Sequence, residues 1–214
     1  PEIRTLPDAV GVNVSFTKSQ YSGFNISCEG YNDGTIRVSQ ITGRAPYTYF
    51  WTATDGGVIS GSATDSLLTN IPAGVYHLQV TDKIGCQYFF SDTLTEPDGI
   101  DLLSEQVSSS PNGAFEISCY GRNDGYITLQ FDGGAGAYTY SWAGPAGYTA
   151  STASINTLTA GTYNLRVTDA NLCHRDYSYP LDEPDSVGIS VVKSLTSDGS
   201  YNISCSGEDG TIDI

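Results

Sequence analysis

The chain has 214 residues, with 24 glycines, 15 tyrosines and no methionine, and only 15% of its residues are charged, a composition typical of an all-β protein rich in turns. Its formal net charge of −15 argues against nucleic acid as a partner, because phosphate binding needs a basic surface. No apolar run approaches the roughly 18 residues needed to cross a bilayer, so we expect no membrane insertion of this segment.

Short strands follow one another along the chain, each marked by alternation of apolar and polar residues between turn residues. In the sequence VYHLQV, Val75 and His77 face one way and Tyr76 and Leu78 the other, which is the pattern of a half-buried strand. The predicted strands of the first 98 residues are 10–16, 24–28, 35–40, 47–52, a short pair at 58–60 and 66–69, then 75–81 and 87–95. About seven short strands in a unit of about 90 residues predict an immunoglobulin-like β-sandwich.

One stretch of about a dozen residues occurs three times: NISCEGYNDGTI from Asn25, EISCYGRNDGYI from Glu116 and NISCSGEDGTI from Asn202. The cysteines of the first two copies are 91 residues apart, as are the tryptophans that follow them, and the motifs later in each unit are 87 residues apart. This regular recurrence indicates tandem structural modules. We predict the tail of a preceding repeat at 1–7, complete repeats at 8–98 and 99–185, and the start of a truncated third repeat at 186–214. The short Glu-Pro-Asp junctions leave little room for a hinge, so neighbouring repeats should lie end to end as a rod.

Two aromatic positions recur in the repeats. Trp51 and Trp142 lie in middle strands, where a large ring fills the space between the sheets; the alternative is an aromatic platform for sugars. Tyr76 and Tyr163 each follow Ala-Gly by two residues, and resemble the sandwich-corner tyrosine whose hydroxyl bonds back to the backbone.

The five cysteines indicate disulfides and an oxidising compartment. Pairing could run within each repeat or across repeats, as Cys86–Cys119 and Cys173–Cys205. If the predicted strands alternate in direction, Cys28 and Cys86 lie at the same end of the first repeat, whereas the cross-repeat partners lie about 25–30 Å apart. We therefore predict the disulfides Cys28–Cys86 and Cys119–Cys173, with Cys205 unpaired in this segment.

The sequence does not indicate an enzyme or a zinc site. The two histidines, His77 and His174, occupy different positions in their repeats, and no Ser/His/Asp set or Cys-x-x-Cys occurs. The glycine-rich stretch 133–136 is a hairpin turn between strands and does not open a helix as a phosphate loop does.

Recurring carboxylates suggest calcium as a possible cofactor at the junctions. Counting strands places the Asp-Gly loop and the Val-Thr-Asp turn at the same end of each repeat, where calcium would find the several carboxylates it prefers. The alternative is turn chemistry alone, since both sequences are common in tight turns. The candidate ligands are Asp8, Asp33 and Asp82 at the first junction, Glu96, Asp98, Asp124 and Asp169 at the second, and Glu183, Asp185 and Asp209 at the third.

The stretch CYGRNDGYITLQFDGGAGAYTYSW, followed by LTAGTYNLRVTDANLC, resembles the repeat of the SprB-type gliding adhesins of the Bacteroidota. The first repeat departs from this pattern at ITGRAPYTYFW. The resemblance implies a very large extracellular protein, exported by the type IX route, attached at the outer membrane, and used for surface attachment and gliding motility. Two roles remain open for the repeats: a rigid spacer, or modules that themselves bind extracellular polysaccharide or solid surfaces.

Three short segments resemble the O-glycosylation signal of Bacteroidota surface proteins, in which serine or threonine stands between aspartate and an apolar residue. The hydroxyl-bearing residues of these segments are Ser66, Thr93 and Ser186. The alternative is that they are ordinary turn and strand residues.

Overall fold

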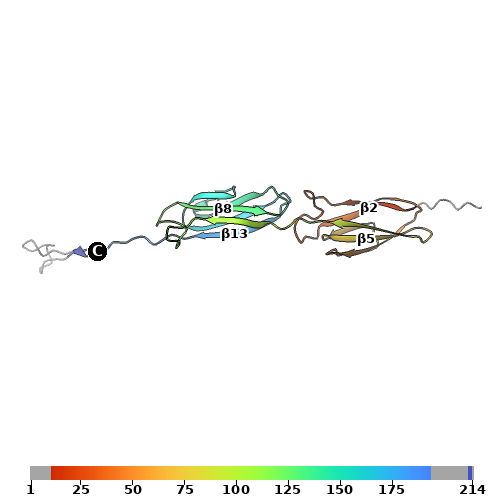
Figure 1. Cartoon of the computed structure of the whole chain (residues 1–214), viewed down its shortest axis with the longest axis horizontal. Coiled ribbons are helices and arrows are strands. Elements are labelled where there is room, and N and C mark those ends of the chain that lie inside the picture. The colour runs from red at the N-terminus through yellow and green to blue at the C-terminus, as the bar shows by residue number, and fades with distance from the viewer. Residues whose placement is uncertain (1–10, 194–211, 214) are drawn as a thin grey trace, which may run out of the picture.

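The computed structural model describes residues 11–193 and 212–213. Two β-sandwiches lie end to end, the first repeat on the right of Figure 1 and the second on the left. The fold is therefore tandem and immunoglobulin-like, as the sequence predicted, and its only helical element within the described residues is the single 3₁₀ turn η1 (Pro145–Gly147).

The first repeat consists of two antiparallel three-stranded sheets. One sheet has the order β1 (Asn13–Lys18), β2 (Gly34–Thr42) and β4 (Leu67–Ile71), and the other β3 (Thr48–Thr54), β5 (Gly74–Thr81) and β6 (Gln87–Leu94). This places the first, second and fourth strands against the third, fifth and sixth, an arrangement of the immunoglobulin-like class.

The second repeat has the same arrangement with one added edge strand. Its sheets have the orders β7 (Asp101–Val107), β8 (Gly125–Asp132) and β11 (Ser154–Leu158), and β10 (Thr149–Ala150), β9 (Thr139–Ala143), β12 (Gly161–Thr168) and β13 (His174–Leu181). A separate short pair is formed by β14 (Val192–Lys193) and β15 (Ile212–Asp213).

Each repeat has its own hydrophobic core, and a tryptophan lies in each. Trp51 and Trp142 are almost completely buried, so the prediction that they are core residues is confirmed. Their indole nitrogens donate to backbone carbonyl oxygens at 2.9 Å, which satisfies the polar end of each ring. The hydroxyl groups of Tyr76 and Tyr163 each donate to the carbonyl oxygen four residues earlier, at 2.8 and 3.1 Å, as expected for a tyrosine corner.

The course of the chain sets which loops meet at the junction. The first repeat begins with β1 at one end and leaves after β6 at the other, because β1, β3 and β6 run in one direction and β2 and β5 return. The sequence predicted a strand at 24–28, but Phe24 forms only an isolated bridge with Tyr21, and residues 25–28 form bends within the connection from β1 to β2. That difference moves Cys28 to the opposite end of the repeat from the one predicted.

Candidate functional site: the bonded junction between repeats

The loop that carries Cys28 closes the C-terminal end of the first repeat. It connects β1 to β2, and the amide of Ile26 donates to the carbonyl oxygen of Thr95 at 3.0 Å. The amide of Gly30 donates to Oε2 of Glu96 at 2.7 Å. Because Thr95 and Glu96 directly follow β6, the loop is fastened to the point at which the chain leaves the repeat.

The Asn-Asp-Gly motif gives this loop its shape. Oδ1 of Asp33 accepts the amide of Ser27 at 3.1 Å, next to Cys28. Gly34 begins β2 where an added Cβ would lie 2.5 Å from Cδ1 of Ile26 and 2.6 Å from the carbonyl oxygen of Ile71, so no side chain fits. The motif recurs because it folds a loop that presents a cysteine.

The second repeat builds the same loop around Cys119. The amide of Ser118 donates to Oδ1 of Asp124 at 3.2 Å, and the amide of Gly121 donates to Oε2 of Glu183 at 2.6 Å. The Ser118 hydroxyl also donates to Oδ2 of Asp124. Hydrogen bonds from the hydroxyl and then the amide of Ser118 lower the pKa of Asp124, which keeps the aspartate charged.

The hairpin between β12 and β13 presents the partner cysteine. Asp169 is only 3% exposed, and its Oδ1 accepts the amides of Asn171 and Cys173 at 2.8 and 3.0 Å. Its Oδ2 accepts the amide of Ala135 from the neighbouring loop at 2.8 Å. The aspartate of Val-Thr-Asp therefore fixes the backbone of the turn and the position of Cys173.

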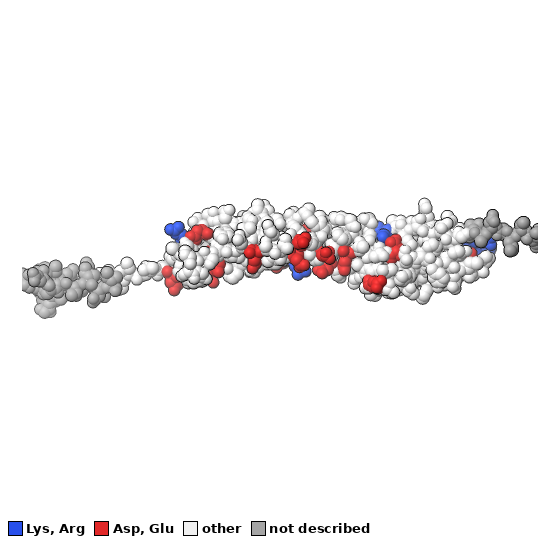
Figure 2. Space-filling model, viewed as in Figure 1, with Lys and Arg blue, Asp and Glu red and all other residues white. Residues whose placement is uncertain are grey.

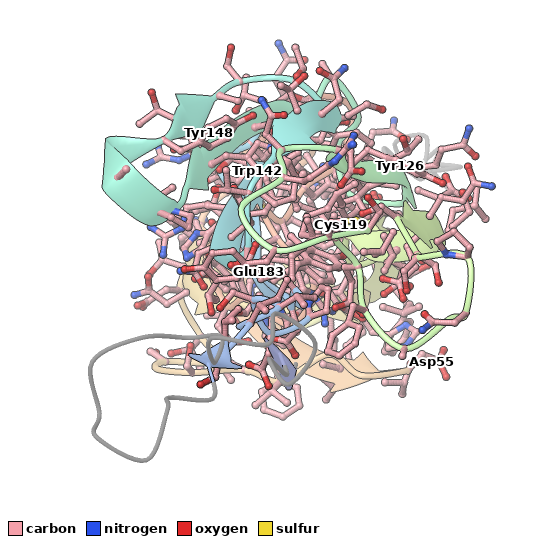
Figure 3. The ribbon with its side chains drawn as sticks, turned by 90° about the vertical axis from the view of Figure 1, so that its left-hand side faces the viewer. Asp55, Cys119, Tyr126, Trp142, Tyr148 and Glu183 are labelled. Carbon is pink, nitrogen blue, oxygen red and sulfur yellow. A yellow bond between two sulfur atoms is a disulfide. The ribbon has the colours of Figure 1, made fainter. Side chains whose placement is uncertain are left out.

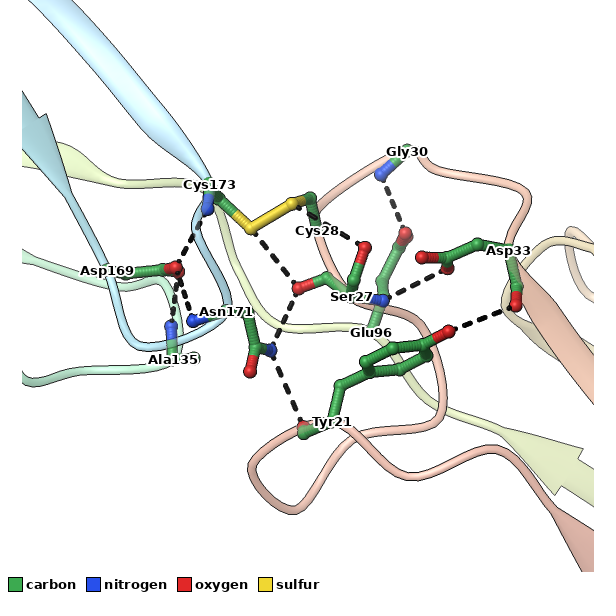
Figure 4. Close-up of a disulfide and its surroundings, with 10 residues drawn as sticks. All are labelled: Tyr21, Ser27, Cys28, Gly30, Asp33, Glu96, Ala135, Asp169, Asn171 and Cys173. Atoms are coloured by element: carbon green, nitrogen blue, oxygen red, sulfur yellow. Dashed lines mark hydrogen bonds between the residues drawn. A yellow bond between two sulfur atoms is a disulfide. The ribbon is translucent and has the colours of Figure 1, made fainter.

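A disulfide joins these two elements across the junction (Figure 4). Cys28 of the first repeat bonds to Cys173 of the second, with Cα atoms 5.7 Å apart and a sequence separation of 145. Beside it, Nδ2 of Asn171 donates to the carbonyl oxygen of Ser27 at 2.9 Å. In addition to the linker, the repeats are thus held together by one disulfide and by the hydrogen bond beside it.

The linker itself is closely packed against the second repeat. The amide of Gly134 donates to the carbonyl oxygen of Asp98 at 2.8 Å, and Ile100 is buried. An added Cβ on Gly133 would lie 2.0 Å from the carbonyl oxygen of Gly99, so this position requires glycine for close backbone approach as well as for its φ of +77°. The backbone on both sides of the junction has little room to hinge.

A polar cleft of about 280 Å³ lies beside the bond, lined in part by Glu29, Asp98, Asp169 and Arg175. Arg175 and Glu29 face each other across the junction, with 3.6 Å between Nη2 and Oε2. More than half of each side chain is exposed, so this ion pair contributes little to stability.

The predicted disulfides Cys28–Cys86 and Cys119–Cys173 are wrong. Cys28 lies beside the end of β6 and Cys86 precedes its start, so a whole strand, about 25 Å, separates them. Cys86 and Cys119 are exposed thiols, and Cys205 lies outside the described residues. The alternation of Phe24, Ile26 and Cys28 is that of a strand, and the glycines that flank it, Gly23 and Gly30, occur at the ends of strands as well as in loops.

The predicted grouping of calcium ligands is wrong for the same reason. Asp124 and Asp169 lie at opposite ends of the second repeat, as Asp33 and Asp82 do in the first. Across residues 11–193 and 212–213, no three side chains of aspartate, glutamate, histidine or cysteine lie close enough to hold a metal ion. Of the remaining candidate ligands, Glu96 and Glu183 accept backbone amides, Asp98 lies in the linker, Asp185 is exposed, and Asp8 and Asp209 lie outside the described residues.

The predicted glycosylation sites are accessible. Ser66, Thr93 and Ser186 are all exposed, Thr93 on strand β6 and the other two outside the strands. Their glycosylation stays a prediction.

Two end-to-end immunoglobulin-like sandwiches define this segment as a tandem array of β-sandwich modules. The family model of the SprB repeat matches it at two places, residues 24–56 and 116–147, which confirms the resemblance found in the sequence. The matched segments contain the cysteine loop and the following two strands of each repeat. The chain therefore carries two segments that match the SprB repeat, and no helix in its described part is long and apolar enough to cross a membrane.

No curated protein matches this sequence. Among solved structures, the C-terminal 282-residue fragment of intimin, in complex with the intimin-binding domain of the translocated intimin receptor, is 16% identical over 79% of this chain, with a TM-score of 0.41; the chain spans 64% of that fragment. An amphioxus IgVJ-C2 molecule is 13% identical, covering 69% of this chain and 94% of its own, with a TM-score of 0.32. Extracellular domains 3–5 of Drosophila OTK are 14% identical, covering 67% and 53%, with a TM-score of 0.26. All three scores lie below 0.5, so the immunoglobulin-like assignment rests on the strand order and the two cores described above.

Proposed function

We propose that this segment is a rigid, disulfide-braced spacer in a very large secreted adhesin, attached at the outer membrane, that supports surface attachment and gliding. The observation that carries the proposal is the Cys28–Cys173 bond across a junction whose linker is already short. A module that only recognises a ligand has no need of a covalent bond to its neighbour. A module that transmits load has such a need.

Two covalent connections restrict the junction more than one does. The packed linker by itself is a single attachment, which restricts bending and twisting of the repeats only in part. The linker and the disulfide together leave rotation only about the line that joins them. The Asn171–Ser27 and Gly134–Asp98 hydrogen bonds oppose that remaining rotation. Bending of the rod at this point therefore requires several contacts to break together.

The surface charge suits a long, soluble stalk. The net charge is −15, and acidic side chains are spread along the visible face of both repeats instead of forming one patch (Figure 2). Like charges along the array oppose its folding back on itself and its association with a neighbouring array, an effect that salt screens.

Solution scattering tests the rigidity. The wild-type chain and Cys28→Ser should both retain two folded repeats, but the variant should show a broader distribution of interatomic distances at the longest separations. Cys86→Ser, which removes an exposed thiol of a similar kind, should scatter like the wild type. Freely jointed repeats in the oxidised wild type would contradict the spacer proposal.

A segment exchange in a gliding host tests the biological role. Residues 8–185 of the adhesin would be replaced by two unrelated immunoglobulin-like domains of similar length. Attachment and gliding should persist if the segment acts as a spacer. Their loss, with the adhesin still displayed on the surface, would favour a binding role.

One observation favours binding of polysaccharide as a second candidate function. On the outer face of the first repeat, Phe50, Gln79 and Phe89 stand opposite one another on β3, β5 and β6. The two phenylalanines are 51% and 72% exposed and line a shallow hollow of about 410 Å³. Exposed aromatic rings offer flat apolar faces to the apolar face of a sugar.

The second repeat lacks this aromatic face. The equivalent row is Ser141, Arg166 and Asp176, in which the last two form an ion pair at 2.8 Å. Binding of the chain to a polysaccharide panel should be lost in the double variant of Phe50→Ala and Phe89→Ala, and retained in Ser141→Ala. Equal binding by all three proteins would exclude this face as the binding site.

A further inference from the structure

Each repeat carries two cysteines of different kinds. We call Cys28 and Cys119 the loop cysteines, and Cys86 and Cys173 the hairpin cysteines; Cys205 has the same place as the loop cysteines in the sequence of the third copy of the motif. The observed bond joins the loop cysteine of one repeat to the hairpin cysteine of the following repeat. Cys86 and Cys119 are left as exposed thiols at the two outer ends of the described pair of repeats.

The free loop cysteine is held in the same way as the bonded one. Around Cys119, the hydrogen bonds from backbone amides to the carboxylates of Glu183 and Asp124 measure 2.6 and 3.2 Å. These lengths are within 0.1 Å of those of the corresponding hydrogen bonds around Cys28. Figure 3 views this end of the second repeat, where Cys119 and Glu183 lie close to each other. The loop is therefore already shaped for a partner hairpin.

The free hairpin cysteine is also preformed. Oδ1 of Asp82 accepts the amides of Ile84 and Cys86 at 3.0 and 2.9 Å, and the amide of Asp82 donates to the carbonyl oxygen of Cys86 at 3.0 Å. In the other hairpin, the corresponding hydrogen bond, from the amide of Asp169 to the carbonyl oxygen of Cys173, measures 2.9 Å. The two hairpins thus present their cysteines through the same turn.

We propose that Cys119 bonds to the hairpin cysteine of a following copy of the repeat, and Cys86 to the loop cysteine of a preceding copy. Each bond forms from two thiols, which lose two protons and two electrons to a small-molecule or protein disulfide; that oxidant is reduced to two thiols. The partner is thus a further repeat of this kind, joined head to tail.

The outer ends carry apolar side chains that such a partner would cover. Tyr120, next to Cys119, is 62% exposed, and Ile84, in the Cys86 hairpin, is 61% exposed. The equivalent residues at the junction bridged by the Cys28–Cys173 disulfide are Glu29 and Asn171, which make polar contacts across it. A junction formed between the C-terminal end of the second repeat and the hairpin of a copy of the first would cover both apolar side chains.

Successive disulfides in this arrangement would overlap in sequence, and this overlap would limit how far the array extends under tension. The Cys28–Cys173 loop already encloses Cys86 and Cys119 in sequence, so the next bond begins inside it. In a continuous array, tension passes from a loop cysteine directly to the next hairpin cysteine, and then along only the 32 residues that separate Cys173 from Cys205. Two repeats could then extend to only about 110 Å when unfolded, against about 600 Å without the bonds.

A chain with one more repeat tests the proposal. A copy of residues 9–98 is inserted between Asp185 and Ser186, and the original chain is otherwise unchanged except for Cys86→Ser in its first repeat. After folding in a glutathione buffer, non-reducing peptide mapping of the monomer should recover Cys28 linked to Cys173, and Cys119 linked to the inserted hairpin cysteine. In the same chain with Cys119→Ser, the inserted hairpin cysteine should be recovered as a thiol.

Recovery of Cys119 as a thiol, with Cys28–Cys173 intact, would overturn the inference. If the inserted copy does not fold, as judged by burial of its tryptophan, a copy of residues 99–185 takes its place in the chain without the Cys86→Ser substitution. That chain has seven cysteines: three titratable thiols support the proposal, and five overturn it. The inference extends the spacer proposal, but the two fail separately, since scattering can report a rod while mapping finds no second bond.

Discussion

Replacing Cys28 with serine should lengthen the chain under force by a predictable amount. The disulfide joins residues 145 apart, so the segment between Cys28 and Cys173 carries no tension when the chain is pulled from its ends, even after both repeats have unfolded. In Cys28→Ser this whole segment enters the load path. At roughly 3.4 Å per residue, the fully unfolded variant should gain about 490 Å of contour length over the wild type.

Single-molecule pulling with optical tweezers measures this gain directly. Exposed thiols are alkylated first, so that no exchange occurs during the measurement. Wild-type chain treated with a reductant should match Cys28→Ser. Cys86→Ser should match the oxidised wild type, because Cys86 takes no part in the bond.

The alternative pairing within each repeat gives a different result. It would close loops of 58 and 54 residues, from Cys28 to Cys86 and from Cys119 to Cys173. Reduction would then release only about 380 Å. A gain near that value, or lengthening of the chain by Cys86→Ser, would refute the bonded junction.

Other consequences of the structure can be measured on the same chain. Gly133→Ala should displace the linker, because its Cβ meets the Gly99 carbonyl oxygen at 2.0 Å, and should speed reduction of the disulfide by dithiothreitol; Gly136→Ala, with a similar φ and open space around it, is the control and should not. Tyr76→Phe removes the 2.8 Å bond to a backbone carbonyl and should lower the free energy of unfolding by about 1 kcal/mol in urea, whereas no change would argue against a structural tyrosine corner. Because the pKa of Asp124 is lowered in the folded state, its stabilising effect should be complete above its ordinary value of 3.8 and be lost as the pH falls through the lower folded value; Asp124→Asn should remove this part of the acid dependence of unfolding. Millimolar calcium should leave the melting temperature unchanged relative to chelator, because the junction carboxylates already accept backbone amides; a rise of several degrees would return calcium to consideration.

Much of each repeat follows from the sequence because it depends on local pattern. Alternation in VYHLQV predicts that Tyr76, Leu78 and Val80 face the core, and all three are buried. The tryptophan in a middle strand of each repeat is predicted to fill the space between the sheets, and both are buried. The spacing of recurring motifs sets the number and order of the repeats without reference to any contact.

The junction could not be predicted in this way, because it depends on the direction of one short segment. Residues 24–28 have the alternation of a strand. Hydrogen bonds from their backbone amides to the carbonyl oxygen of Thr95, some 70 residues later, nevertheless hold them as a loop at the end of the sandwich. Whether they cross the sheet or remain at its end reverses the position of Cys28, and with it the disulfide partner. The sequence by itself determined the repeats and their cores, whereas the tertiary structure decided that a cysteine bonds across the junction, because only long-range contacts distinguish a loop from a strand in five residues.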